Sequence, residues 1–177
     1  MGSMHFDRMR FVIADDSTHM RRIIRAILHS LGAREIYEAE DGAVALEIVE
    51  SQQPDILITD WVMPVIDGIE LVQFIRNPKG RTPFLPIIML TGYTEKGRIQ
   101  QARDAGVTEF LAKPISATAL YERIQSIVEL PRPFVKAKGY FGPCRRRQKK
   151  NFKGEGRREQ DNRALLDDKA SHEKVAV

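Results

Sequence analysis

The sequence contains a single cysteine, Cys144, among its 177 residues. A single cysteine cannot form an internal disulfide, which excludes a disulfide-stapled secreted domain and favours a reducing compartment. No apolar run approaches the roughly 18 residues that a membrane span needs. The N-terminus also lacks a basic stretch leading into an apolar signal core. We therefore expect a soluble, cytoplasmic protein without stable membrane insertion.

Charge is distributed unevenly along the chain, although the net value is only +4. Residues 1–130 carry 14 Lys and Arg against 18 Asp and Glu, whereas residues 131–177 carry 14 against 6. Pro131 marks the change, because proline removes a backbone donor and disfavours helix before it. We predict a cloning remnant at residues 1–3, a folded domain at 4–130, and an arginine-rich tail at 131–177 that is largely disordered without a ligand.

Short apolar runs alternate with longer segments of helical periodicity in the first 130 residues, as a parallel sheet with crossover helices requires. The expected strands cover residues 10–14, 36–39, 55–59, 86–90 and 108–112. Five β-α units of this size predict a flavodoxin-like (βα)5 fold, with a doubly wound parallel sheet in strand order 2-1-3-4-5.

Polar side chains follow four of these strands. Ligand sites in open parallel sheets lie at the carboxyl ends of the strands, near the switch in strand order. The residues at those positions are Asp15, Asp16, Asp60, Thr91 and Lys113. Three neighbouring carboxylates repel one another unless a cation compensates them, and oxygen ligands of this kind suit Mg²⁺. The sequence therefore predicts a magnesium site.

The remaining two residues complete a site for phosphoryl transfer. Lys113 supplies a mobile positive charge and Thr91 a hydroxyl that can donate to a phosphoryl oxygen. Phosphoryl transfer is catalysed mainly by positioning and charge neutralisation, and an aspartate is an accepted nucleophile for it. Taken singly, the acids could cap a helix and the lysine could be solvated. Their joint occurrence at four strand ends favours a site.

Four segments of the sequence carry a resemblance to a known family. The segments that carry it are Asp15-Asp16, Asp60 to Gly68, Leu90-Thr91-Gly92, and Phe110 to Pro114. They resemble the receiver domain of CheY-like two-component response regulators. The resemblance implies that Asp60 accepts a phosphoryl group from a histidine kinase or a phosphotransfer protein, and that the protein is not an enzyme in the usual sense.

The resemblance also implies roles for individual residues. Asp16, Asp60 and the backbone carbonyl of Val62 would bind Mg²⁺, with Asp15 acting largely through a water. Thr91 and Phe110 would form the switch pair, and the Lys113-Pro114 bond would be cis. Phe110 occupies a position where tyrosine is frequent in the family. Because phenylalanine has no hydroxyl group, only the packing of its ring can signal whether the protein is phosphorylated. The loop from Asn77 to Leu85 is longer than usual, and the sequence offers no function for it.

Charged tails are usually solvated, but three features of this tail point to a ligand. Tyr140 and Phe141 stand beside arginines, and such pairs form stacking surfaces for nucleobases. Arg158 and Asp161 have an R-x-x-D spacing similar to that of cyclic di-GMP inhibitory sites. Gly139 to Arg147 resembles the Cle subfamily of CheY-like regulators, whose extension binds cyclic di-GMP and which act at the flagellar motor switch. The residues implicated in cyclic di-GMP binding are Tyr140, Arg145, Arg146, Arg147, Arg157, Arg158 and Asp161.

Two alternatives remain open for the tail. The protein could be a plain phosphorelay or chemotaxis receiver with an idle tail. The tail could also bind a nucleic acid or an anionic membrane, although we do not expect a nucleic-acid partner. The hypothesis adopted is a single-domain response regulator that combines phosphorylation at Asp60 with cyclic di-GMP binding and docking on a flagellar motor switch protein.

Overall fold

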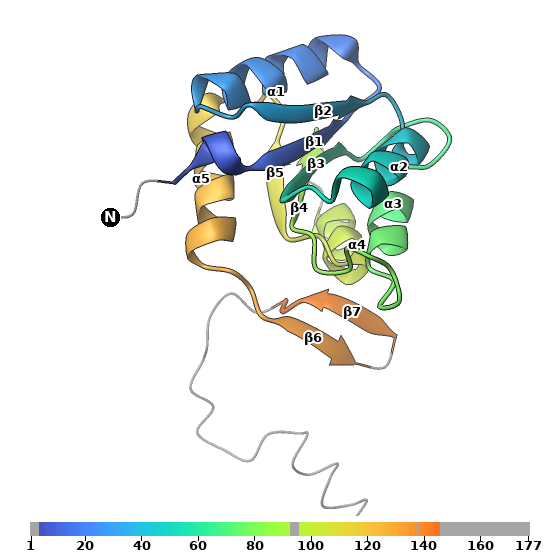
Figure 1. Ribbon diagram of the computed structural model, residues 1–177. Helices are drawn as coiled ribbons and strands as arrows, with labels where there is room; N and C mark the ends of the chain where they lie inside the picture. The colour runs from blue at the N-terminus through green and yellow to red at the C-terminus, as the bar shows by residue number, and fades with distance from the viewer. Residues whose placement is uncertain (1–3, 93–95, 138, 146–177) are drawn as a thin grey trace, which may run out of the picture. The chain divides into compact units, whose positions relative to one another are not determined.

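The computed structural model describes residues 4–92, 96–137 and 139–145, and its centre is a five-stranded parallel sheet (Figure 1). The strands are β1 (Arg10–Ala14), β2 (Glu35–Ala39), β3 (Ile56–Asp60), β4 (Ile87–Thr91) and β5 (Glu109–Ala112), in the order β2-β1-β3-β4-β5. The helices are α1 (Thr18–Ser30), α2 (Gly42–Gln52), α3 (Gly68–Ile75), α4 (Lys96–Ala105) and α5 (Ala117–Glu129). This arrangement confirms the predicted flavodoxin-like fold and strand order.

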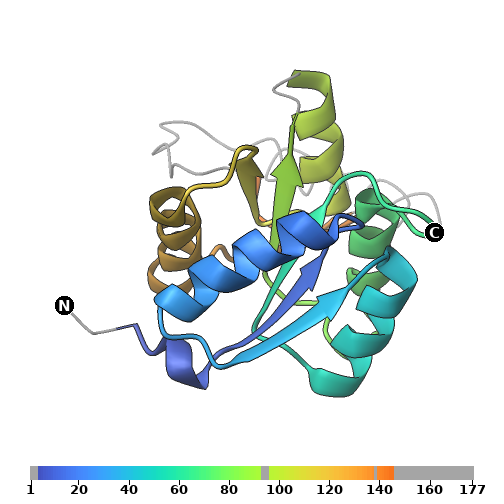
Figure 2. The same ribbon diagram turned by 90° about the horizontal axis from the view of Figure 1, so that it is seen from above.

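Helices cover both faces of the sheet (Figure 2). One core cluster contains Val12, Leu57 and Met89 with residues of α2, α3 and α4, while the other contains Ile13 and Ile58 with residues of α1 and α5. The central strands β3 and β4 are apolar along almost their whole length because both of their faces are buried. The edge strand β2 is half exposed, as its mixed composition predicts.

Local sequence fixes where the helices begin near the carboxyl ends of the strands. Ser17 caps α1 by accepting a hydrogen bond from the Met20 amide at 3.3 Å. Asp67 and Glu70 form a reciprocal capping box at the start of α3. Gly68 follows this cap, and a Cβ at this position would clash with the backbone carbonyl of Asp60. The glycine therefore lets α3 start directly against the end of β3.

The chain continues beyond α5 as a hairpin of β6 (Phe134–Ala137) and β7 (Tyr140–Pro143). Gly139 makes the turn with a φ of 76°, which glycine adopts without steric cost. Three aromatic rings hold the hairpin, because Phe84 lies edge-on to Phe134 and Phe141 at centroid distances of 5.0 and 5.4 Å.

The first compact unit of the chain consequently ends at Arg145, and not near residue 130 as the charge pattern suggested. The apolar stretches of the hairpin are short and stand among basic residues, so the sequence pattern does not indicate strands there. Its main apolar partner, Phe84, comes from a distant loop between α3 and β4.

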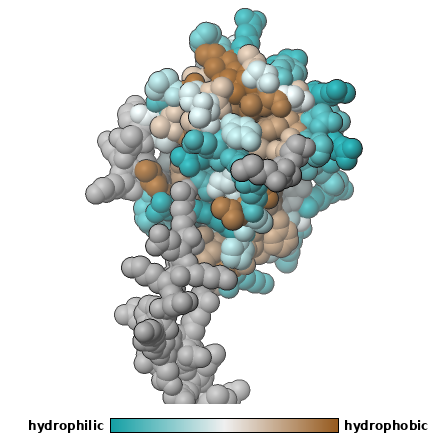
Figure 3. Space-filling model, turned by 90° about the vertical axis from the view of Figure 1, so that its left-hand side faces the viewer, coloured by the Kyte–Doolittle hydropathy of each residue, from teal (hydrophilic) through white to brown (hydrophobic). Residues whose placement is uncertain are grey.

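Among the residues that the structure describes, no helix combines the length and apolarity that crossing a membrane requires. The face seen in Figure 3 carries hydrophobic side chains in patches among hydrophilic ones. Val128 and Leu130, at and just after the end of α5, are among the exposed large apolar residues.

Candidate functional site

Three acidic side chains meet at the carboxyl ends of β1 and β3. Asp15 and Asp16 follow β1, and Asp60 is the last residue of β3. Each offers a carboxylate oxygen, and these oxygens all lie within 4.8 Å of one another. The Asp15 side chain is fully buried, and that of Asp60 is 14% exposed. The predicted convergence of these acids is therefore present in the structure.

Lys113 joins two of the acids. Its Nζ lies 3.1 Å from Oδ2 of Asp15 and 3.0 Å from Oδ1 of Asp60. The lysine reaches them from the loop after β5, where its own backbone amide donates to the Thr91 carbonyl at 2.8 Å. The Lys113-Pro114 peptide bond is cis, as expected. Lys113 thus places a cation between a buried carboxylate and a partly exposed one.

The ionisation of this pair reflects a competition between burial and charge. Burial raises the pKa of Asp60, and the hydrogen bond and charge of Lys113 only partly oppose this effect. Burial lowers the pKa of Lys113, but the hydrogen bonds and charges of Asp60 and Asp15 outweigh it, so that the pKa is raised overall. Lys113 is therefore positively charged at neutral pH. It faces Asp60, whose pKa is higher than that of a free aspartate.

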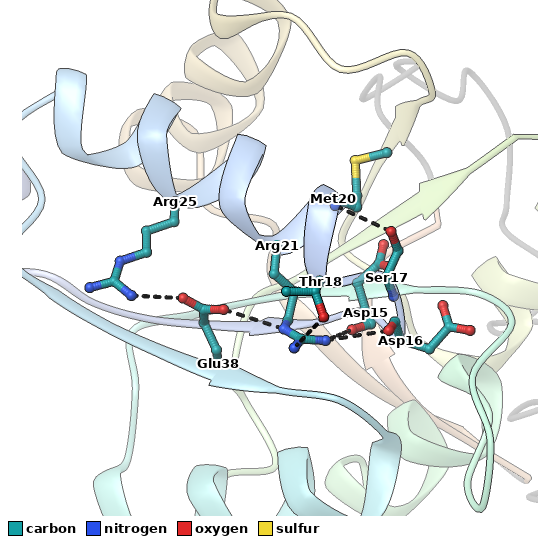
Figure 4. A network of polar contacts seen from close by, with 8 residues as sticks. All are labelled: Asp15, Asp16, Ser17, Thr18, Met20, Arg21, Arg25 and Glu38. Carbon is teal, nitrogen blue, oxygen red and sulfur yellow. Dashed lines mark hydrogen bonds and ion pairs between the residues drawn. The ribbon is translucent and has the colours of Figure 1, made fainter.

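Residues that the sequence analysis missed orient Asp15. Oδ1 of Asp15 accepts a hydrogen bond from the Ser17 amide at 2.8 Å. Arg21 of α1 donates to the Asp15 carbonyl at 2.7 Å and also pairs with Glu38 of β2, which binds Arg25 in addition (Figure 4). The single available signal was an arginine in the first turns of α1, which in isolation indicates only a solvated helix face.

The acidic trio fits a hard divalent cation. Asp16 is exposed, and its carboxylate points away from Arg21 in Figure 4. Asp60 pairs with Lys113 and accepts a backbone hydrogen bond from Trp61, and the trio as a whole carries more negative charge than one lysine neutralises. Val62 lies two residues after Asp60 in the open loop, with its side chain 63% exposed. The oxygen-only ligand set is the type that Mg²⁺ prefers in proteins.

The two predicted switch residues lie on neighbouring strands. Thr91 ends β4 and is buried, and Phe110 in β5 is half-buried and packs against the core cluster on the α2, α3 and α4 side. The register places Thr91 beside Ala112, so that the strand ends bearing Thr91 and Lys113 are adjacent. Thr91 therefore lies at the same rim of the sheet as the acids.

The predicted tail residues divide at the end of the described chain. Tyr140 and Arg145 belong to the hairpin region, where the Arg145 guanidinium lies 4.1 Å from the centre of the Tyr140 ring and its Nη1 is 2.8 Å from Oδ1 of Asp104. Arg146, Arg147, Arg157, Arg158 and Asp161 lie outside the described residues. The aromatic-arginine pair expected from the sequence is thus present for Tyr140.

Comparison with known proteins gives a consistent result. Residues 11–125 match the family model described as the response regulator receiver domain. The chain is 40% identical over 121 residues to a chemotaxis protein CheY of Pseudomonas aeruginosa, covering 68% of this chain and 97% of that one. It is 36% identical over 121 residues to the chemotaxis protein CheY-3 of Vibrio cholerae, covering 68% of this chain and 92% of that one.

Solved structures show the same similarity. The chemotaxis protein CheY4 of Vibrio cholerae superposes with a TM-score of 0.62 at 33% identity, covering 67% of this chain and 98% of that one. The receiver domain of a sensor histidine kinase from Pseudomonas aeruginosa, solved with a magnesium ion in its active site cleft, has a TM-score of 0.63 at 29% identity. It covers 68% of this chain and 98% of its own.

Proposed function

Because the chain belongs to the response regulator receiver domain family, we propose that it is a signalling protein that accepts a phosphoryl group on Asp60. The single observation that carries this proposal is the position of Lys113, within 3.1 Å of both Asp15 and Asp60 at the carboxyl ends of the strands. A histidine kinase or phosphotransfer protein is the donor that this family implies, and a cytoplasmic location follows from such a donor.

The proposed transfer uses the exposed edge of Asp60. A carboxylate oxygen of Asp60 attacks the phosphorus as the phosphorus–nitrogen bond to the donor histidine breaks, and the histidine retains that electron pair. Lys113 would neutralise the charge that gathers on the phosphoryl oxygens, and the Thr91 hydroxyl would donate to one of them. Asp15 keeps the lysine in place, since its own carboxylate is fully buried.

Asp15, Asp16, Asp60 and the Val62 carbonyl are the groups that would hold Mg²⁺. When bound, the ion would supply Lewis-acid neutralisation of the phosphoryl oxygens and of the acidic trio. The fit rests on three carboxylate oxygens within 4.8 Å of one another. The magnesium ion in the related receiver domain from Pseudomonas aeruginosa lends support by similarity.

A small-molecule phosphodonor tests this proposal. Incubation with acetyl phosphate and Mg²⁺ should add one phosphoryl group to the protein, measured by intact mass spectrometry. Asp60→Asn should abolish the adduct, whereas Asp7→Asn, an exposed acid far from the site, should leave it unchanged. An adduct that persists in Asp60→Asn, or no adduct on the wild-type protein, would refute the proposal.

We also propose that the arginine-rich tail binds cyclic di-GMP and thereby controls docking on a flagellar motor switch protein. The sequence of the tail and its resemblance to the Cle subfamily support this role. A further argument is the guanidinium of Arg145 above Tyr140, since the same stacking geometry serves for a nucleobase. The chemotaxis proteins among the relatives favour a role in motility.

Calorimetry with cyclic di-GMP at moderate salt tests the tail. Saturable micromolar binding that Arg146→Ala and Arg158→Ala abolish supports the proposal. Binding to any polyanion with a steep salt dependence would instead favour a nucleic-acid or membrane tail. If no titration produces a heat of binding, the protein would be a plain receiver whose tail binds none of these ligands.

A further inference from the structure

A groove of about 510 Å³ lies between the hairpin and the C-terminal ends of α3 and α4. Ligand pockets commonly have volumes of about 300–1,000 Å³. Its lining includes Lys136 and Tyr140 from the hairpin, Asp104 from α4, and Arg76 and Asn77 from the end of α3. The groove lies near the amino ends of β4 and β5, and thus at the opposite end of the sheet from Asp60.

Arg76 is a buried cation that no carboxylate of the described residues pairs with. It is 4% exposed, its Nε and Nη1 donate to the carbonyls of Gly106 and Pro83 at 2.9 and 3.0 Å, and its Nη2 donates to the Thr108 hydroxyl at 3.5 Å. Burial lowers its pKa to about 10, against a small opposing effect of Tyr140, so the side chain stays charged at neutral pH. Burying a charge without a counter-ion is costly. An anion in the groove would offset that cost.

Lys136 adds a second positive charge to the same groove. Its side chain is exposed on β6, and it lies beside the aromatic rings of Tyr140 and Phe141 in the lining. Two cations next to aromatic surface suit a ligand that joins a phosphate to a flat ring, which is the chemistry of a nucleotide.

Two lining residues, Asp104 and Tyr140, contact Arg145 at the border of the groove and favour guanine among the bases. Arg145 stacks on Tyr140 and is held by Asp104, so that an arginine and a carboxylate stand side by side at the edge of an aromatic ring. A carboxylate can accept from the N1–H and N2–H groups of guanine, while arginine fits the O6 and N7 edge. Adenine has a hydrogen-bond acceptor at N1. It would face the carboxylate, which is also an acceptor, and the two would repel each other.

We infer that this groove is a guanine-nucleotide subsite, with Lys136 on the phosphate, the buried charge of Arg76 attracting it from nearby, and Asp104, Arg145 and Tyr140 on the base. The inference rests on the proposed cyclic di-GMP function and deepens it, because that ligand carries both groups. It assigns part of the ligand contact to the receiver domain and the hairpin. Ligand recognition therefore does not belong to residues 146–177 alone.

Two exposed residues of the groove allow a test on the full chain by calorimetry. Lys136→Ala and Asp104→Asn should each weaken cyclic di-GMP binding about tenfold, as the loss of one good contact implies. Asp104→Asn should also reduce the preference for GMP over AMP. Arg34→Ala, which removes one exposed positive charge elsewhere, should leave the affinity unchanged. All variants should still be phosphorylated on Asp60.

The outcomes separate this inference from the function on which it rests. Wild-type affinity in both groove variants, with binding lost in Arg146→Ala, would overturn the subsite and leave the tail proposal standing. Tighter binding by Asp104→Asn would also overturn it, because Asp104 would then compete with the ligand for Arg145. Absence of nucleotide binding by the wild-type chain would refute both.

Discussion

The two ends of the parallel sheet hold their charges in different ways. At the carboxyl end, three acids lie close together, one lysine pairs with two of them, and the negative charge is in excess. At the amino end, Arg76 is buried among backbone carbonyls and aromatic rings, and the positive charge is in excess. The family match covers residues 11–125 and ends before the hairpin begins at Phe134. The first end thus belongs to the general receiver framework, and the second adds a segment outside the matched region.

The comparison teaches that one chain can build sites of opposite charge on a single sheet. The proposals place a cation and a phosphoryl group at the acidic rim and an anion in the hairpin groove. Because the two regions lie at opposite ends of the sheet, they should respond independently to substitution.

Lys113→Met should have the largest effect, and only at the acidic rim. It leaves the buried Asp15 without its cation, and we expect a loss of about 2 kcal/mol in the free energy of unfolding, allowing for the partial exposure of the lysine. Phosphorylation of Asp60 by acetyl phosphate should slow about a hundredfold. Urea unfolding and intact mass spectrometry measure the two effects. Lys79→Met, an exposed lysine, serves as the control, and equal behaviour of the two variants would contradict the assignment.

Phe141→Ala should affect the amino end alone. Removing this ring from its contacts with Phe84 and Phe134 should cost about 2 kcal/mol of stability, which is less than for a fully buried phenylalanine. The phosphorylation rate of Asp60 should stay at the wild-type value. Phe74→Ala, which removes an exposed ring from α3, should be nearly neutral. A slower phosphorylation in Phe141→Ala would show that the two ends are coupled.

Asp16→Asn should raise the stability of the Mg²⁺-free protein and reduce the additional stability that Mg²⁺ confers. Without the ion, removing one of three neighbouring negative charges should stabilise the fold by about 1 kcal/mol. With the ion, the gain in stability that Mg²⁺ confers should shrink, because one ligand is lost. Thermal unfolding across a Mg²⁺ titration measures both effects. If Mg²⁺ stabilised Asp16→Asn as strongly as the wild type, Asp16 would not be a ligand.

The ion pair between Asp104 and Arg145 should contribute the least to stability. Both side chains are nearly half exposed, and such pairs are worth about 0–1 kcal/mol. A double-mutant cycle with Asp104→Asn and Arg145→Gln, followed by urea unfolding, isolates the coupling energy. A coupling well above that range would mean that the pair fastens the hairpin to α4, in addition to any role in a ligand site.

The sequence predicted the acidic rim better than the hairpin, for a physical reason. Strand ends and their carboxylates follow from local patterns, so Asp15, Asp60 and Lys113 could be brought together by topology alone. The bonds from Arg21 to the Asp15 carbonyl and to Glu38 depend on how α1 sits on the sheet, which no local pattern specifies.

The hairpin was missed because its packing is non-local. Phe84 lies 50 positions before Phe134 in the sequence, and neither residue stands in a strong periodic pattern. The loop from Asn77 to Leu85 had no role in the sequence analysis, but in the structure it supplies Phe84 to the hairpin and the Pro83 carbonyl to Arg76. These two contacts give the loop a structural role that the sequence analysis did not assign.

The identity of the phosphorylated residue tests the central claim most directly. After reaction with acetyl phosphate and Mg²⁺, borohydride reduction converts an aspartyl phosphate to homoserine, which peptide mass spectrometry can locate. We predict homoserine at position 60 and none at position 15 or 16, because Asp15 is fully buried and Asp60 combines the Lys113 contact with partial exposure. Homoserine at another aspartate, with Asp60 unmodified, would contradict this account.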